Sequence, residues 1–119
     1  MLMKIKRLWL GIIFESGKLI KAKKSYRGIG KTNMLIKKAQ EDGLTIIVGS
    51  QQAYDEIKGL TQFVNVLRLK KGYTVELKGK AGGILLDESL DLYMVEWLKK
   101  QKEWEIRGGF IREDDGNDN

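Results

Sequence analysis

The chain has 119 residues and a formal net charge of +6, and its length fits one domain with a single core of ordinary size. It contains no cysteine and no histidine, which excludes disulfides, thiolate chemistry, Ser-His-Asp catalysis and zinc sites built from Cys or His. Acid–base chemistry must therefore use carboxylates, lysine or tyrosine. Magnesium, which prefers oxygen ligands, is the metal that this composition suits best.

Basic side chains are concentrated at the start of the chain. Residues 1–31 contain nine lysine or arginine side chains and one acidic residue, Glu15. This excess favours phosphate-bearing partners, either a nucleotide or DNA or RNA bound through the basic N-terminal region. A lysine-rich surface that only keeps the protein in solution explains the charge equally well. The acidic, polar stretch 113–119 is typical of a disordered tail.

The apolar runs are too short for a membrane span, which needs roughly 18 residues, so we expect no membrane association. The longest run, at residues 8–14, has no small-residue cleavage site before Glu15, which argues against a signal peptide. With no cysteine in the chain, we expect an intracellular, cytoplasmic location.

The first half of the chain predicts alternating helices and strands. In chain order these are a helix over 4–15, a strand over 19–23, a helix over 31–42 that stops at Gly43, a strand over 44–50 and a helix over 51–60. The β-branched run within 44–50 is typical of a strand buried on both faces. The helix over 51–60 is expected to turn Ala53, Tyr54 and Ile57 inward.

The second half continues the alternation. Residues 62–69 and 73–77 alternate as strands do and are compatible with a hairpin, and 82–88 is an apolar run that ends in two carboxylates. The clearest helix is predicted from helical spacing of Leu90, Tyr93, Met94, Trp97 and Leu98. A last strand or hairpin follows over 104–112. This order of elements predicts an α/β fold with a mainly parallel sheet.

Residues 25–32, SYRGIGKT, combine what a phosphate-binding loop needs. Gly28 and Gly30 allow backbone N–H groups to approach an anion closely. Lys31 supplies a cation and Thr32 a hydroxyl for Mg²⁺, at the point where a helix is predicted to begin. A glycine-rich turn before an ordinary helix is the simpler explanation. However, Gly-x-Gly-Lys-Ser/Thr arises by chance in on the order of one chain in a few hundred of this length.

A second pattern is ILLDE, in which an apolar strand ends in Asp87 and Glu88. Phosphoryl transfer with Mg²⁺ needs a carboxylate near the metal and, for hydrolysis, a group that activates water. Ligands in open α/β sheets bind at the carboxyl ends of the strands, where these side chains should lie. Alternatively, Asp87 or Glu88 caps the next helix.

The two patterns resemble Walker A and Walker B of a P-loop NTPase. The Asp-Glu pair resembles the additional-strand catalytic-glutamate division, which contains helicases, RecA-like ATPases and viral packaging motors. Arg27 before GIGKT is similar to the arginine within the Walker A of phage terminase-type ATPases. The resemblance implies a three-layer P-loop domain over 1–112, short for that group, in a phage or mobile-element setting.

The resemblance also implies roles for individual residues. The loop residues that would wrap the phosphates of ATP or GTP are Ser25, Tyr26, Arg27, Gly28, Ile29, Gly30, Lys31 and Thr32. Lys31 would contact the β- and γ-phosphates, and Thr32 and Asp87 would hold Mg²⁺. Glu88 would activate water. Ser25 replaces the glycine that usually opens the loop.

Several accessory roles follow less directly from the sequence. Gln51 or Gln52 lies after a strand, where it would meet the nucleotide or nucleic acid, although a surface loop is the simpler interpretation. Arg107 or Arg112 is a candidate arginine finger in a homo-oligomer or with a larger protein partner. Without such a finger, hydrolysis is slower by roughly 10³–10⁵.

The aromatic residues suggest base stacking only weakly. Trp9 and Trp97 lie in apolar patterns and are expected in the core, whereas Trp104, between charged residues, is the one expected at the surface. Tyr26 occupies a variable loop position. The lysines at 21, 23 and 24 fit either an edge strand protected from aggregation or a DNA-binding face.

We therefore expect ATP or GTP binding with slow Mg²⁺-dependent hydrolysis, coupled to DNA or RNA. The competing interpretation is a non-catalytic nucleic-acid- or protein-binding regulatory protein that keeps the fold. A small-molecule kinase is a weaker third option, because this length leaves little room for an acceptor pocket and lid.

Overall fold

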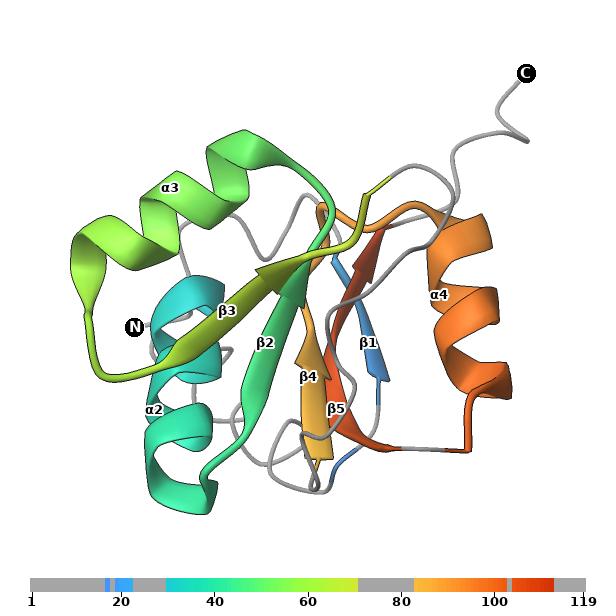
Figure 1. The fold of residues 1–119 in the computed structure, drawn as a ribbon, viewed down its shortest axis with the longest axis horizontal. Helices are drawn as coiled ribbons and strands as arrows, with labels where there is room; N and C mark the ends of the chain where they lie inside the picture. Colours follow the sequence, from blue (N-terminus) through green and yellow to red (C-terminus); the bar gives the residue numbers. More distant parts are fainter. Residues whose placement is uncertain (1–16, 18, 23–29, 71–82, 103, 113–119) are drawn as a thin grey trace, which may run out of the picture.

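The computed structural model describes residues 17, 19–22, 30–70, 83–102 and 104–112, which form five strands and three helices (Figure 1). The elements are β1 (Leu19–Ala22), α2 (Lys31–Asp42), β2 (Thr45–Val48), α3 (Gln51–Leu60), β3 (Asn65–Arg68), β4 (Gly83–Leu86), α4 (Leu92–Lys100) and β5 (Glu105–Arg112). The helix expected over 4–15, the strand expected over 73–77, the loop residues 25–29 and the tail 113–119 lie outside the described residues.

The strands form one sheet in the order β1-β5-β4-β2-β3, and every neighbouring pair is parallel. The α/β fold with a mainly parallel sheet is therefore confirmed. Strand β4 is central: Leu85 pairs with Ile46 of β2, and Ile84 pairs with Ile106 of β5. All parallel strands end at the same edge of the sheet, so the segments that follow them gather there.

Helices cover both faces of the sheet, with α2 and α3 on one side and α4 on the other (Figure 1). Side chains alternate between the faces along each strand. Ile46 and Leu85 belong to the same core cluster as Leu35 of α2. On the other face, Ile47 joins the cluster that contains Val95 of α4. The result is a three-layer α/β/α arrangement, which explains why β2 is buried on both faces.

Local signals fix the helix boundaries. Gly43 ends α2 in the left-handed conformation, with φ 67°, as expected for a glycine stop. Ser50 caps α3 by accepting the N–H of Ala53 at 3.1 Å. Asp91 caps α4 by accepting the N–H of Met94 at 2.8 Å. Both interactions satisfy N–H groups that have no partner inside a helix.

The inward face of α3 is as expected, because Ile57 is buried and Ala53 and Tyr54 pack against the core. In α4, however, Tyr93 belongs to the apolar spacing that predicted the helix, yet its side chain is 78% exposed. The helix begins at Leu92, so Leu90 lies before it. The spacing between Leu90 and Tyr93 therefore does not place the two side chains on one face of the helix. Leu98, which belongs to the predicted pattern, is buried, and so is Val95, which the pattern did not include.

Trp97 packs against the core as expected, but the expected exposure of Trp104 is wrong. Trp104 packs against the α4 cluster, and its ring centroid lies 6.2 Å from that of Trp97. Its Nε1 is buried and has no hydrogen-bond partner among the described residues. Trp104 directly precedes β5, which brings it over α4 despite its charged neighbours in sequence. Lys21 is exposed on β1, an edge strand, and Trp9, Lys23 and Lys24 lie outside the described residues.

Close contact between β4 and β5 depends on glycine. Gly109 has φ 136°, a backbone conformation that residues other than glycine rarely adopt. It lies where the β4–β5 register shifts. A Cβ atom there would come within 2.5 Å of the backbone N of Leu86. No helix in the described part of the chain has the length and apolar character needed to cross a membrane.

We expect Gly109→Ala to lower the free energy of unfolding by about 2–4 kcal/mol, because the added methyl overlaps backbone and the positive φ is strained. Urea and thermal unfolding measure the change. Gly59→Ala in α3 is the matched control, since no atom of the described residues lies within 4 Å of its added Cβ. That variant should keep or raise stability by up to about 1 kcal/mol. Equal unfolding free energies for the two variants would contradict the close contact.

Candidate functional site

The carboxyl edge of the sheet brings together the start of α2, the start of α3 and the segment after β4. These elements border a depression of about 260 Å³, which we call the α2–β4 hollow. Its lining residues are Thr32, Ser50, Gln52, Ala53, Glu56, Ile57, Asp87, Glu88 and Ser89. Hydroxyls, an amide and carboxylates thus face a common space.

The N-cap residue of α2 provides no side-chain cap. Gly30 precedes the helix with φ 88°, which favours glycine, and its carbonyl accepts the N–H of Met34 at 3.0 Å. Glycine has no side chain that could accept the N–H groups of the first turn. Lys31 and Thr32 occupy that turn, so a cation and a hydroxyl stand beside the positive end of the helix dipole.

Lys31 and Glu88 form an ion pair between α2 and the segment after β4. Lys31 Nζ lies 3.8 Å from Glu88 Oε1, and the two side chains are 15% and 46% exposed. The distance is long for an ion pair, and the Glu88 side chain is about half exposed to solvent. The ion pair therefore contributes little to stability. The pair nevertheless joins the two sequence patterns in space.

Asp87 is held at the end of β4 by its backbone. Its N–H donates to the carbonyl of Ile47 at 3.0 Å, continuing the β2–β4 pairing for one more residue. Its Oδ2 accepts the N–H of Ser89 at 2.9 Å, and its carbonyl accepts the N–H of Leu90 at 3.1 Å. These bonds form a tight turn, and α4 is capped by Asp91. The alternative that Asp87 or Glu88 caps the next helix is therefore wrong.

Ser89 ties three strand ends together. Its Oγ accepts the N–H of Gly49, which follows β2, at 2.8 Å. Its carbonyl accepts a bond from Arg112 Nη2, at the end of β5, at 3.0 Å. Gly49 is packed so closely that a Cβ atom would lie 2.5 Å from the Ser89 carbonyl oxygen. These contacts fix the turn that carries Asp87 and Glu88.

Ser89, Ser50 and Glu56 were not predicted as site residues. Ser50 follows a strand and precedes a helix, a pattern that signals an N-cap and so a position at the carboxyl edge. Glu56 lies within α3 and is exposed, and nothing local to its sequence indicates that it lines a site. The role of Ser89 depends on contacts with Gly49 and Arg112, far away along the chain.

The two candidate glutamines, Gln51 and Gln52, lie in different surroundings. Gln52 lines the α2–β4 hollow. Gln51 instead lies on the surface, where it accepts from Arg68 Nη1 at 3.1 Å and donates to Asp55 at 2.8 Å. Ser25, Tyr26, Arg27, Gly28 and Ile29 fall outside the described residues. Of the eight loop residues, Gly30, Lys31 and Thr32 are described.

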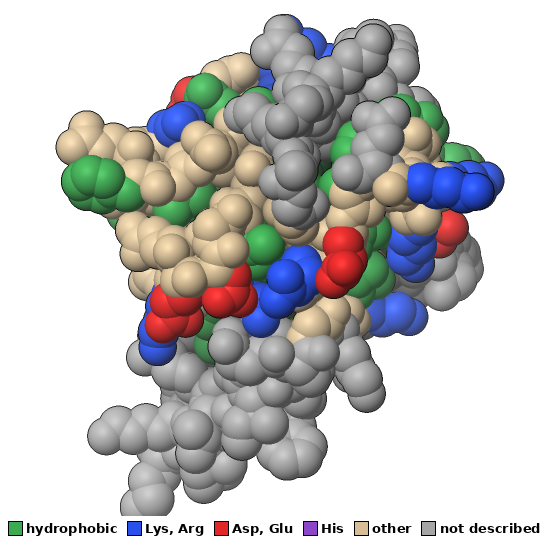
Figure 2. Space-filling view, turned by 60° about the horizontal axis from the view of Figure 1, so that its bottom comes forward, with side chains coloured by type: hydrophobic (Ala, Val, Ile, Leu, Met, Phe, Trp, Pro, Cys, Tyr) green, Lys and Arg blue, Asp and Glu red, His purple; other side chains and the backbone are tan. Residues whose placement is uncertain are grey.

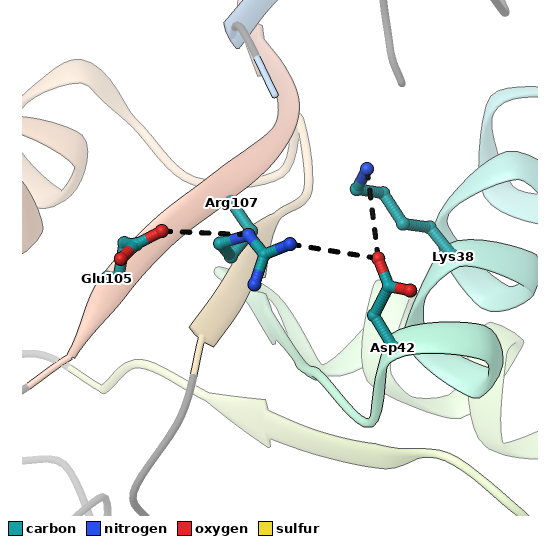
Figure 3. Close-up of polar contacts among 4 residues, drawn as sticks. All are labelled: Lys38, Asp42, Glu105 and Arg107. Atoms are coloured by element: carbon teal, nitrogen blue, oxygen red, sulfur yellow. Dashed lines mark ion pairs between the residues drawn. The ribbon is translucent and has the colours of Figure 1, made fainter. Parts of the chain in front are cut away.

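The two candidate arginines lie at opposite edges of the sheet. Arg112 is at the carboxyl edge beside Ser89, whereas Arg107 is near the start of β5. Figure 2 brings the opposite edge forward and shows acidic and basic side chains next to one another there. Arg107 bridges Asp42 and Glu105 at 3.9 and 3.6 Å, and Lys38 also reaches Asp42 (Figure 3). Arg107 therefore belongs to a cluster that joins α2 to β5.

Two side chains with oxygen atoms that could serve as ligands for a divalent ion come from two elements. Thr32 and Asp87 both line the α2–β4 hollow. Within the described ranges, no three acidic side chains gather closely enough to hold a metal ion by themselves. One hydroxyl and one carboxylate fit Mg²⁺ in a site where phosphate oxygens and water complete the coordination.

Comparison with known proteins gives no relative: no family model, curated protein or solved structure matches the chain.

Asp91 caps α4 and Glu88 does not, so the two residues should differ in their effect on stability. We expect Asp91→Ala to lower the free energy of unfolding by about 1 kcal/mol, because α4 loses its N-cap. Glu88→Ala should change it by less than about 0.5 kcal/mol, since only a long, half-exposed ion pair is lost. Urea unfolding of both variants measures this. A larger loss in Glu88→Ala would mean that Glu88 is structural.

Proposed function

We propose that this protein binds a nucleoside triphosphate, ATP or GTP, at the start of α2 and hydrolyses it slowly with Mg²⁺. The observation that carries the proposal is the meeting of the two sequence patterns. Lys31 pairs with Glu88, and Thr32 lines the same hollow as Asp87 and Glu88. These residues lie more than 50 positions apart in sequence and come together at the edge where α/β folds bind ligands.

Each residue has a role that fits its position. The N–H groups of the first turn of α2 and the Lys31 ammonium would bind the phosphates. Thr32 and Asp87 would hold Mg²⁺, which offsets the charge that develops on the phosphate oxygens. Glu88 is close enough to Lys31 to face the terminal phosphate, where its carboxylate would orient and deprotonate water.

The strand order supports the same interpretation. The division that the two motifs resemble is named for an additional strand in its sheet. Here β5 lies between β1, which leads toward the loop, and β4, which ends at Asp87. Strand order depends on long-range pairing and was not used to identify the motifs, so it supports the proposal independently.

The charges around the site support slow rather than fast turnover. Lys31 lies against Glu88, so phosphate must draw the ammonium away from the carboxylate before Glu88 can act on water. Arg107 is engaged at the opposite edge by Asp42 and Glu105, which disfavours it as an arginine finger. The phage or mobile-element setting rests on the motif resemblance alone. A basic stretch before Lys31 favours coupling to DNA or RNA.

Nucleotide binding tests the first half of the proposal. Lys31→Ala should weaken binding of Mg²⁺–ATP or Mg²⁺–GTP at least about tenfold, because an ammonium that contacts phosphate is lost. Isothermal titration calorimetry measures the affinity. Lys37→Ala is the matched control, since Lys37 is an exposed lysine of the same helix. Equal affinities in the two variants would remove Lys31 from the site.

Turnover tests the second half. Glu88→Gln should keep nucleotide binding and lower phosphate release at least about 100-fold, because the amide cannot accept the proton of water. A coupled phosphate-release assay on purified protein measures the rate. Binding without turnover in the wild type would favour the non-catalytic regulatory alternative. Unchanged turnover in Glu88→Gln would exclude Glu88 as the base.

A further inference from the structure

A large aromatic side chain stands at the surface on the connection between α3 and β3. Phe63 is 79% exposed, although the next residue, Val64, is buried in the core. The backbone there is fixed: Thr61 ends α3 by donating its N–H to Ile57 at 3.1 Å. The Thr61 hydroxyl accepts the N–H of Phe63 at 3.1 Å. A defined turn thus holds the phenyl ring outward.

Phe63 borders an open groove of about 590 Å³ on the α2 side of the sheet, which we call the α2–α3 groove. The lining residues that matter for binding are Asn33, Gln40, Lys58, Gln62 and Phe63. Gln40 Nε2 of α2 lies 3.4 Å from the Thr61 hydroxyl, which links the two walls. Figure 2 shows hydrophobic side chains at the end of the molecule where α3 passes into β3, surrounded mainly by uncharged polar groups.

The charge of this groove differs from that of the α2–β4 hollow. The described residues that line the groove include Lys58 and no carboxylate, whereas Glu56, Asp87 and Glu88 line the hollow. Three side-chain amides, on Asn33, Gln40 and Gln62, add donors and acceptors. A cation, amides and one exposed ring are complementary to a partner that carries phosphates, polar edges and flat apolar faces.

We propose that the α2–α3 groove binds single-stranded nucleic acid, with a base stacked on Phe63 and a backbone phosphate near Lys58. Base–aromatic stacking requires unpaired bases, which is why the proposal names single strands. The amides would contact base edges, as Asn and Gln do elsewhere. A protein partner fits less well, because the centres of protein interfaces are depleted in lysine and more apolar than this lining.

The α2–α3 groove would be the surface that binds the nucleic-acid partner of the proposed function. The proposed single-strand binding does not rest on nucleotide binding, because the two sites share no lining residue. Helix α2 nevertheless connects them: Thr32 lines the hollow and Asn33, the next residue, lines the groove. Because the two sites are separate, nucleotide binding and single-strand binding can be tested independently. Lys31→Ala should therefore leave single-strand binding within about twofold of wild type.

Fluorescence anisotropy with labelled 12-nucleotide oligo-dT and oligo-U tests the proposal. Phe63→Ala should weaken binding roughly 5- to 100-fold, as expected when one stacked base loses its ring. Tyr93→Ala is the matched control, because Tyr93 is equally exposed, at 78%, but belongs to α4 on the other face of the sheet. It should bind like wild type, and Phe63→Trp should restore binding. Circular dichroism checks that all variants are folded.

Salt dependence provides the second measurement. Lys58→Ala should reduce the slope of log affinity against log salt by about 0.7, the value for one phosphate contact on a single strand. An unchanged slope would overturn the assignment of Lys58. No binding by the wild type, equal affinity of wild type and Phe63→Ala, or equal loss in Tyr93→Ala would overturn the proposal. A wild-type dimer that Phe63→Ala dissociates in light scattering would instead make this surface an interface between copies.

Discussion

Strand β4 is buried on both faces, and its parallel pairing with β2 and β5 decides where Asp87 and Glu88 lie. Ile84, Leu85 and Leu86 are buried in the core on the two faces of the sheet. Asp87 is the first residue after the strand that is accessible to solvent. Gly109 lets β5 approach Leu86 closely, and Ser89 bonds to residues that follow β2 and end β5. The acidic pair therefore stands on a rigid support, as precise site geometry requires.

The basic half of the site is positioned by helix packing. Leu35 and Ala39 bury one face of α2 against the sheet, which brings the first turn of the helix to the carboxyl edge. The Lys31–Glu88 ion pair is the point where the two halves meet, and at 3.8 Å it is too weak to determine the fold. Under the proposed function, Lys31 would bind phosphate and Glu88 would activate water, and an arriving phosphate would have to separate the two charges, which are only 3.8 Å apart.

Much of this arrangement was predictable from local sequence. The observed bounds of α2 and α3 are those expected, because Gly43 stops one helix and Ser50 caps the other. The buried strands β2 and β4 were predictable from continuous apolar runs that end in polar residues. Each of these signals lies within a few residues of the element that it defines.

The features that were missed depend on tertiary contacts. The exposure of Tyr93 follows from where α4 begins, and that boundary is set by the Asp91 cap rather than by apolar spacing. Trp104 is covered because β5 packs beside α4, although its sequence neighbours are charged. The position of Ser89 likewise depends on its contacts with Gly49 and Arg112, which follow β2 and end β5 and meet Ser89 only in the folded chain.

The most direct measurement is a titration of ¹⁵N-labelled protein with Mg²⁺–ATP, followed by two-dimensional NMR. If one phosphate site joins the start of α2 to the end of β4, the amide signals of Gly30, Lys31, Thr32, Asp87 and Glu88 should shift together with a single dissociation constant. The signals of Asp42 and Glu105 at the opposite edge should stay in place. Shifts confined to exposed lysines, or no shift at Thr32 and Asp87, would contradict the site.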